Sequence, residues 1–287
     1  MASKLYLKQF RLPSFGQEDD FIQSQHRTCY NGIYPFKLFP ARQLRTLDFA
    51  AVTIFYGSNG SGKTTLLNII AEKLRLIRHS PFNGSAFFPE YISMCAANTS
   101  AIPRDSRILT SDDVSDYLLN LRCLNDGIDA RRNELFDEYT ARKYKDLRFS
   151  SLADYDDWKV GYDAKTKSQS QFVKERLMRN VDMHSNGETA MLYYTDRITE
   201  DALYLMDEPE NSLSAKLQLE LQKFIADSAR FFGCQFVIAT HSPFFLSIPG
   251  AKIYDLDESP VAAKNWTELE NVRIFYDFFM EHQEEFQ

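Results

Sequence analysis

Short apolar runs alternate with amphipathic stretches along much of this chain. Runs of about four to eight residues that are rich in β-branched and aromatic side chains are typical of buried strands. Such runs occur at residues 4–10, 52–56, 202–206, 235–240 and 252–256. Strands that alternate with helices favour a largely parallel sheet covered by helices. The pattern therefore predicts an α/β fold.

Two amphipathic stretches follow the second and third of these runs. An apolar stripe after residues 52–56 predicts a helix that runs to about Arg78. Its members are Leu67, Ile70, Leu74 and Ile77. The stripe after residues 202–206 consists of Leu217, Leu221, Phe224 and Ile225. Ser214 is the predicted N-cap of this second helix, and Gly233 is its predicted C-cap.

Two segments depart from the alternation. Residues 12–46 are rich in aromatic residues, Pro and Gly, and we expect an irregular β or loop excursion near the first strand. Residues 111–182 are dense in charge and carry no strand signal, which predicts a helical insertion. The predicted domains are therefore an α/β core of residues 1–110 and 183–287, and a helical lobe of residues 111–182.

The predicted insertion differs in charge from the rest of the chain. Residues 131–180 contain 12 Lys and Arg against 9 Asp and Glu, whereas the remaining residues are more acidic. Two interpretations stay open: contact with an acidic partner, or an ordinary solvated helical surface.

The C-terminal stretch carries a bulky apolar stripe at helical spacing. Its members are Trp266, Leu269, Val272, Phe275 or Tyr276, and Phe279. This helix either covers the sheet of its own chain or docks a partner. We expect the first, in which case deleting residues 262–287 unfolds the protein.

Composition narrows the function classes. The 287 residues and 44% hydrophobic content fit one large α/β domain or two small ones. With 33 basic and 40 acidic residues, the net charge of −7 argues against coating nucleic acid or an anionic membrane through bulk charge, although a local basic patch for DNA stays open. The four cysteines form no CxxC pair, which disfavours a zinc site or disulfide scaffold. No apolar leader or spanning segment occurs, so we expect a cytoplasmic protein for which a membrane partner is disfavoured.

A glycine-rich loop lies between the 52–56 run and the helical stripe that follows it. Gly57, Gly62, Lys63 and Thr64 have the P-loop spacing. In such a loop, backbone N–H groups and the helix N-terminus face a phosphate chain, the lysine adds a charge, and the threonine hydroxyl can ligate Mg²⁺. A turn that merely connects strand and helix needs neither side chain. The predicted nucleotide-binding residues are Gly57, Ser58, Asn59, Gly60, Ser61, Gly62, Lys63, Thr64 and Thr65.

Three further candidate residues follow predicted strands. Asp207 ends the 202–206 run and can hold Mg²⁺ together with Thr64, while Glu208 can orient or deprotonate the attacking water. His241 follows the next strand and can bind a γ-phosphate or that water, because strand ends line the ligand crevice of a parallel sheet. The alternatives are an exposed strand-to-turn junction for the carboxylates and a capping or packing role for the histidine.

Together these motifs resemble the nucleotide-binding domain of the ABC-type ATPases. The resemblance is closer to the soluble branch that includes SMC-like repair ATPases and the OLD-type and Septu-type ATPases of phage defence. GSNGSGKT matches the Walker A loop, LYLMDEPE matches Walker B with Glu208 as the catalytic glutamate, ENSLS matches the D-loop, and His241 matches the switch histidine. HSNGE, residues 184–188, is the candidate signature, in which Ser185, Gly187 and Glu188 would face the nucleotide of the opposite subunit.

The resemblance implies a mechanism with ATP and Mg²⁺ as cofactors. It implies a P-loop NTPase fold, an ABC ATPase-type head with a mainly parallel sheet, an N-terminal β excursion and a helical insertion. Two copies, or a higher even number, would close head to tail, with each ATP between Lys63 of one subunit and Ser185 of the other. Hydrolysis by Glu208 would reopen the dimer.

Three positions depart from the family pattern. The signature begins with His184 in place of leucine and has Asn186 in place of its first glycine. The D-loop ends in Ser214 where transporters have Asp, and no glutamine lies at a Q-loop position. Our hypothesis assigns the Mg²⁺-sensing role of that glutamine to Ser111 or Asp112.

Spacing separates the branches of the family. Ser185 follows Lys63 by 122 positions, which is too few for long coiled-coil arms, and 46 residues follow His241, too few for a Toprim nuclease. We therefore expect an ATPase that regulates a separate effector, a nuclease or toxin, in antiviral defence or DNA maintenance. The alternatives are a nucleotide-dependent scaffold with little hydrolysis and the ATPase subunit of a membrane transporter.

Overall fold

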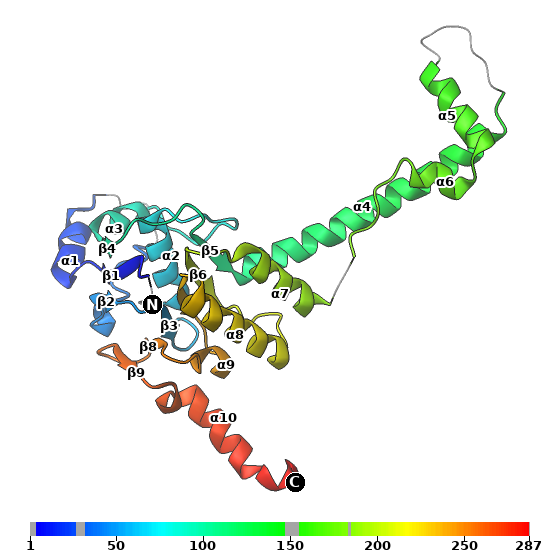
Figure 1. The fold of residues 1–287 in the computed structure, drawn as a ribbon. Coiled ribbons are helices and arrows are strands. Elements are labelled where there is room, and N and C mark those ends of the chain that lie inside the picture. Colours follow the sequence, from blue (N-terminus) through cyan, green and yellow to red (C-terminus); the bar gives the residue numbers. More distant parts are fainter. Residues whose placement is uncertain (1–3, 27–31, 147–154, 183–184, 287) are drawn as a thin grey trace. The chain divides into compact units, whose positions relative to one another are not determined.

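The structure, a computed structural model, describes residues 4–26, 32–146, 155–182 and 185–286 (Figure 1). The chain forms two compact units: residues 1–114 with 185–287, called the sheet unit here, and residues 115–184, called the helical unit. In the described ranges, every helix is too short or too polar to cross a membrane.

A six-stranded sheet forms the centre of the sheet unit. Its strand order is β5-β6-β7-β3-β8-β9, and all neighbouring pairs are parallel except β8 and β9. The strands are β3 (Val52–Tyr56), β5 (Arg107–Thr110), β6 (Leu203–Asp207), β7 (Gln235–Ala239), β8 (Lys252–Asp255) and β9 (Ala262–Lys264). Every residue of β3, β6 and β7 is buried, as expected for central strands covered on both faces. The expected, mainly parallel α/β fold is confirmed.

A smaller antiparallel sheet, of order β2-β1-β4, forms the N-terminal β excursion. It consists of β1 (Leu7–Arg11), β2 (Thr46–Asp48) and β4 (Ala96–Thr99). The fully buried side chain of Gln235 joins the two sheets. Its Oε1 accepts hydrogen bonds from the backbone N–H groups of Tyr6 and Leu7, and its Nε2 donates to the carbonyl oxygens of Leu7 and Ala50. A buried amide with all these partners fixes how the first strand meets the larger sheet.

Helices complete the sheet unit. They are α1 (Phe15–Ser24), α2 (Lys63–Leu74), α3 (Phe88–Met94), α7 (Asn186–Arg197), α8 (Ala215–Phe231), α9 (Pro243–Leu246) and α10 (Glu270–Glu281), with 3₁₀ turns η1 (Pro40–Arg42), η3 (Trp266–Glu268) and η4 (Gln283–Phe286). The predicted N-cap Ser214 is confirmed, since its side chain accepts from Leu217 N–H. Phe232 caps the other end of α8, and Gly233 takes a left-handed conformation one residue later.

Two expectations about local structure were wrong. The helix expected to reach Arg78 ends at Leu74, because Arg75 adopts the left-handed conformation (φ 54°) and closes α2. The segment 12–46 was expected to be irregular but contains α1. A capping box starts that helix, with Ser14 and Gln17 exchanging side-chain and backbone hydrogen bonds. The apolar stripe of α1 is short, which is why periodicity alone did not reveal it.

The helical unit is built on α4 (Ser111–Lys143), whose first residues belong to the sheet unit. The other helices are α5 (Tyr155–Thr166) and α6 (Gln169–Lys174). These three helices share a small core of Leu135, Tyr139, Ala164, Phe172 and Val173. The expected helical segment is thus present.

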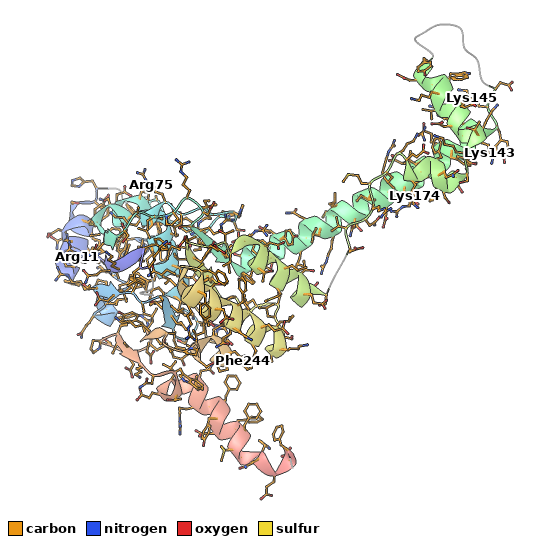
Figure 2. The ribbon with its side chains drawn as sticks, in the orientation of Figure 1. Arg11, Arg75, Lys143, Lys145, Lys174 and Phe244 are labelled. Atoms are coloured by element: carbon orange, nitrogen blue, oxygen red, sulfur yellow. The ribbon has the colours of Figure 1, made fainter. Side chains whose placement is uncertain are left out.

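The C-terminal helix α10 does not cover the sheet. Leu269 and Val272, at its start, are buried. Beyond them the stripe is exposed: Phe275 is 43% exposed and Phe279 is 52% exposed. Figure 1 shows α10 leading away from the six-stranded sheet, and Figure 2 shows its side chains projecting from the helix. The expectation that this helix packs on its own sheet is therefore wrong for most of its length.

Candidate nucleotide site

The glycine-rich loop connects β3 to α2, and two of its glycines are required by its shape. A side chain at Gly57 would place its Cβ 2.6 Å from Oγ of Ser61, so the loop can fold this tightly only without one. Gly62 caps α2 with φ 96°, a conformation that residues with a side chain rarely adopt. Asn59 and Gly60 lie at the exposed tip of the loop.

Lys63 lies folded over the loop that precedes it. Its Nζ donates to the carbonyl oxygens of Gly57 (2.7 Å) and Ser58 (3.1 Å), and the residue is only 4% exposed. The ammonium group is thus held at the centre of the loop, where the charge of a phosphate chain would need compensation.

Thr64 and Asp207 meet at the carboxyl ends of the parallel strands. The Thr64 hydroxyl donates to Oδ1 of Asp207 at 3.0 Å, across 143 positions of sequence. Burial and, to a smaller extent, the nearby Glu208 carboxylate together raise the pKa of Asp207 to about 7, although the hydrogen bond from Thr64 acts in the opposite direction. The structure therefore brings together the two residues expected to hold Mg²⁺.

A cavity of about 340 Å³ opens beside this pair. Ser111 and Asp112 line it together with Thr64 and Asp207, so both candidates for the missing Q-loop glutamine lie near the expected metal ligands. Tyr34 and Arg78 also line it, and sequence analysis missed both. The Tyr34 hydroxyl donates to Oγ1 of Thr65 at 2.8 Å.

Arg78 is a partly buried cation at the same cavity. Burial lowers the pKa of its guanidinium group, although the carboxylates of Glu72, Asp113 and Asp207 favour the charged form. Its Nη2 donates to Oδ1 of Asn68 at 2.6 Å. The only sequence signal for this residue was its position shortly after the P-loop helix.

Glu208 occupies a strained backbone position. Its φ of 47° lies in the left-handed region, which a residue with a side chain occupies only when its surroundings enforce it. The backbone N–H donates to the carbonyl oxygen of Ala239 at 2.9 Å, and Oε2 accepts from Nδ2 of Asn211 at 3.2 Å. Hydrogen bonds on both sides therefore hold the carboxylate next to Asp207.

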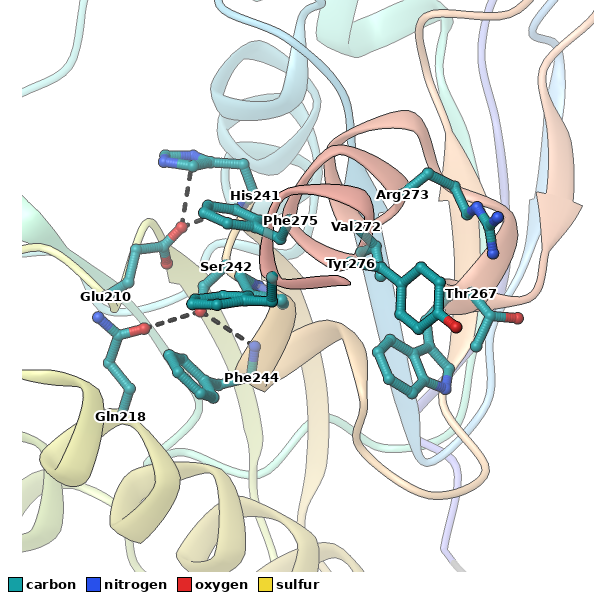
Figure 3. Close-up of a pocket in the computed structure, with 13 residues that line it drawn as sticks. Glu210, Gln218, His241, Ser242, Phe244, Thr267, Val272, Arg273, Phe275 and Tyr276 are labelled. Atoms are coloured by element: carbon teal, nitrogen blue, oxygen red, sulfur yellow. Dashed lines mark hydrogen bonds and ion pairs between the residues drawn. The ribbon is translucent and has the colours of Figure 1, made fainter. Parts of the chain in front are cut away.

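His241 follows β7 and is held by Glu210, the residue shared by the Walker B and D-loop matches, to which no role was assigned from the sequence. Oε1 of Glu210 accepts from the Thr240 hydroxyl (2.7 Å) and from His241 N–H (3.0 Å), and lies 3.4 Å from Nδ1 of His241 (Figure 3). The His241 side chain is 48% exposed. The imidazole is therefore not a buried packing side chain. The backbone of His241 is nevertheless held in place by its hydrogen bond to Glu210.

A carboxylate from the end of β8 also reaches the glycine-rich loop. Asp257 accepts from the backbone N–H of Ser58 (2.6 Å) and from its hydroxyl (2.9 Å). This contact joins the loop to a residue 199 positions away, so sequence pattern gave no signal for it.

The candidate signature begins α7. Ser185 and Glu188 form a capping box in which the Ser185 hydroxyl accepts from Glu188 N–H while Oε2 of Glu188 accepts from Ser185 N–H at 2.9 Å. At Gly187 a Cβ would lie 2.9 Å from Cδ1 of Leu217 and 3.1 Å from the Ser212 carbonyl oxygen, so this glycine permits close contact with the D-loop. His184 lies outside the described residues.

The loop has the features that bound ATP and Mg²⁺ require. Besides the tight glycine turn and the Thr64–Asp207 pair, Oγ of Ser61 is buried and has no hydrogen-bond partner among the described residues. A buried hydroxyl without a partner is unfavourable and would be satisfied by a ligand oxygen. The residues present therefore fit a nucleotide phosphate chain with a divalent cation.

Comparison with known proteins agrees with this site. The family described as ABC transporter matches residues 46–211, more than half of the chain. The chain belongs to this family and is an ABC-type ATPase with a P-loop. No curated protein matches it.

Several solved structures are similar to the chain at low identity. An Smc head domain from Pyrococcus furiosus, bound to the C-terminal domain of ScpA, is 13% identical, with a TM-score of 0.44 over 96% of this chain and 100% of that one. The SMC head domain from Thermotoga maritima is 11% identical, with a TM-score of 0.37 over 91% and 98%. A dimeric ATP-binding cassette bound to ADP and Pi is 14% identical, with a TM-score of 0.36 over 77% and 88%.

Proposed function

We propose that this protein is an ATP-hydrolysing clamp in which two copies close head to tail around ATP and reopen on hydrolysis. The observation that carries the hydrolytic part is the contact of Thr64 with Asp207 beside the buried Lys63. These groups come from the helix α2 and the strand β6 and meet at the carboxyl ends of the parallel strands, where sheets of this kind bind ligands.

Each residue of the site would have a distinct role. Residues 57–65 would bind the phosphate chain, and Thr64 with Asp207 would hold Mg²⁺, which neutralises phosphate charge when bound. Glu208 would orient the attacking water and take its proton, since Asn211 leaves the carboxylate held but only partly buried. His241 would hydrogen-bond near the γ-phosphate, with its backbone fixed by Glu210.

The position of Ser185 supports a second copy. Ser185 is exposed at the N-terminus of the 12-residue helix α7, where backbone N–H groups and the helix dipole favour an anion. It is not among the residues that line the cavity beside Thr64 and Asp207. We therefore propose that Ser185, Gly187 and Glu188 approach the nucleotide of a partner copy.

We further propose that the clamp regulates a separate effector, a nuclease or toxin, in phage defence or DNA maintenance. The support is the motif set, which resembles the soluble branch of the family. The exposed helix α10 adds a surface on which another protein could act.

The test is the mass in solution of the Glu208→Gln protein with and without ATP and Mg²⁺. Removing the proton acceptor while keeping the binding groups should trap the closed state, so ATP should convert monomer to dimer, or to a larger even-numbered assembly. Adding Lys63→Ala or Ser185→Arg should abolish this change. Glu220→Gln, a partly exposed glutamate of α8, is the matched control and should behave as wild type.

The clamp is contradicted if Glu208→Gln binds ATP but keeps its mass. The signature would then be wrongly assigned, and a static nucleotide-dependent scaffold would be the better description.

A further inference from the structure

A second cavity lies at the base of α10, outside the phosphate-binding loop. It measures about 750 Å³ and is lined by aromatic residues of the 266–279 segment, by the residues that follow β7, and by Glu210 and Gln218 (Figure 3). We call it the α10 groove. One wall is His241 and Ser242, so the groove borders the candidate catalytic histidine.

The α10 groove continues onto an exposed aromatic surface. Phe275, Tyr276, Phe278 and Phe279 are between 43% and 53% exposed. An aromatic side chain buries about 150–250 Å² when covered, so four rings that are half exposed leave on the order of 400 Å² of largely apolar surface. Contiguous apolar surface of this size on a monomer is commonly a binding site.

The charges around the groove indicate the chemistry of its occupant. Glu210 is 8% exposed, and its Oε2 has no hydrogen-bond partner in the described part of the chain. Glu210 therefore places a negative charge at the wall of the groove, which favours an occupant that carries positive charge.

The segment from 270 to 286 is also acidic. Its carboxylates are Glu270, Asp277, Glu281, Glu284 and Glu285, against the single basic side chain of Arg273 and the imidazole of His282. A second copy of this helix would bring like charges together, whereas a basic segment would be attracted. Charge complementarity therefore favours a different protein over self-association.

We propose that the α10 groove binds a helical segment of a partner protein, with apolar side chains on one face and Lys or Arg along its edges. Apolar side chains of the segment would cover Phe275, Tyr276 and Phe279. Basic groups at its edges would face the acidic side chains of residues 270–286 and the negative charge of Glu210. This recognition of an amphipathic helix by an apolar groove uses anchors spaced at three and four residues.

The groove is joined to the nucleotide site by hydrogen bonds. Nδ2 of Asn271 donates to the His241 carbonyl oxygen at 3.0 Å, and the N–H of Asn271 donates to the Tyr56 hydroxyl at 3.0 Å. Tyr56 is the last residue of β3, directly before the glycine-rich loop. The inference rests on the proposed function here, because the occupant would be the effector that the clamp regulates.

The experiment uses the full chain and two labelled peptides of about 15 residues, roughly four helical turns. One carries leucines at helical spacing with lysines elsewhere, and the other has glutamate in place of every lysine. Fluorescence anisotropy measures binding without nucleotide. The lysine peptide should bind, and the glutamate peptide should not.

Two matched variants locate the site. Phe279→Ser should raise the dissociation constant of the lysine peptide at least ~10-fold, as expected on removing a central aromatic anchor. Phe231→Ser, an exposed phenylalanine of α8 that does not line the groove, should leave it unchanged. Glu210→Gln should weaken binding by a smaller factor. Melting curves check that each variant folds.

Several results would overturn the proposal. They are binding of neither peptide, equal binding of both, or equal weakening by Phe279→Ser and Phe231→Ser. Nucleotide-free dimers that Phe279→Ser dissociates, with no peptide binding, would identify a second copy as the occupant instead. If peptide binding followed the expected pattern while the mass of Glu208→Gln did not change with ATP, the α10 groove would still be a binding site. The proposal that two copies close around ATP would then be wrong.

Discussion

The carboxyl-terminal edge of the six-stranded sheet, called the strand edge here, and the helix α10 belong to the same unit. The strand edge buries charged side chains, whereas α10 exposes apolar ones. At the carboxyl ends of the strands, Lys63 and Asp207 are buried and have partners: Lys63 donates to loop carbonyl oxygens, and Asp207 accepts from Thr64. Along α10, large apolar rings are exposed; Phe278 is 53% exposed. Most polar groups of the first region have partners within the chain, whereas the aromatic rings of the second are not covered by it.

This difference means that the two regions would bind their ligands in different ways. The strand edge is preorganised, since its polar groups hold one another before a ligand arrives, which reduces the reorganisation that catalysis requires. The exposed rings of α10 gain stability only when another surface covers them. Disturbing the first region should therefore affect activity and folding, while disturbing the second should affect neither.

The largest expected effect is on hydrolysis. Lys63→Ala removes the buried ammonium group from the centre of the glycine-rich loop, so phosphate release from ATP should fall by about 10²–10³-fold, the range seen when one preorganised charge-stabilising group is lost. Lys223→Ala, an exposed lysine of α8, should retain wild-type turnover. If the Lys63→Ala protein hydrolysed ATP at the wild-type rate, the strand edge would not be the site of hydrolysis.

The next effect tests where packing ends along the C-terminal segment. Leu269 is fully buried, so Leu269→Ala should lower the free energy of unfolding by about 2–5 kcal/mol. Phe278 is half exposed, so Phe278→Ala should change it by less than about 1 kcal/mol. Urea unfolding of both variants measures this. Equal losses would show that α10 packs on the unit and would remove the contrast between the two regions.

The smallest effect concerns pH. The pKa of Asp207 is about 7 in the folded protein, well above the value of 3.8 for an unperturbed aspartate, so the folded state binds a proton more tightly than the unfolded state. This group therefore makes the protein more stable as pH falls. Between pH 8 and pH 6, the wild type should gain about 1.4 kcal/mol relative to Asp207→Asn.

Unfolding measured without nucleotide and with a chelator tests this expectation. Asn at position 207 can still accept from Thr64 but does not titrate, so it isolates the ionisation. A difference between the two proteins that stays constant from pH 8 to pH 6 would mean that the Asp207 carboxyl is solvated, and that the strand edge is less buried than the structure shows.

Local sequence patterns predicted most of the motif residues at the strand edge but few of the residues that contact them from other parts of the chain. The P-loop, Asp207, Glu208 and His241 were recognisable because each lies directly after an apolar strand and the spacing to the next element is short. Asp257 was not, since its contact with Ser58 spans 199 positions and depends on β8 pairing with β3. Tyr34 was not predicted because its contact with Thr65 depends on the tertiary fold, and Arg78 was not predicted because no motif marks a cation there, although it lies only ten positions from its partner Asn68.

The sequence by itself determined the fold class, the motifs and the helical character of the C-terminal stripe, because hydrophobic periodicity and the spacing of glycine, lysine and carboxylates act over a few residues. Only the tertiary structure decided that Glu210 holds His241 and that the rings of α10 stay uncovered. Periodicity shows that a helix has an apolar face, but which surface covers that face depends on where the chain places the helix. Here the burial of Leu269 and Val272 anchors the start of α10, and the described part of the chain leaves the aromatic rings that follow exposed.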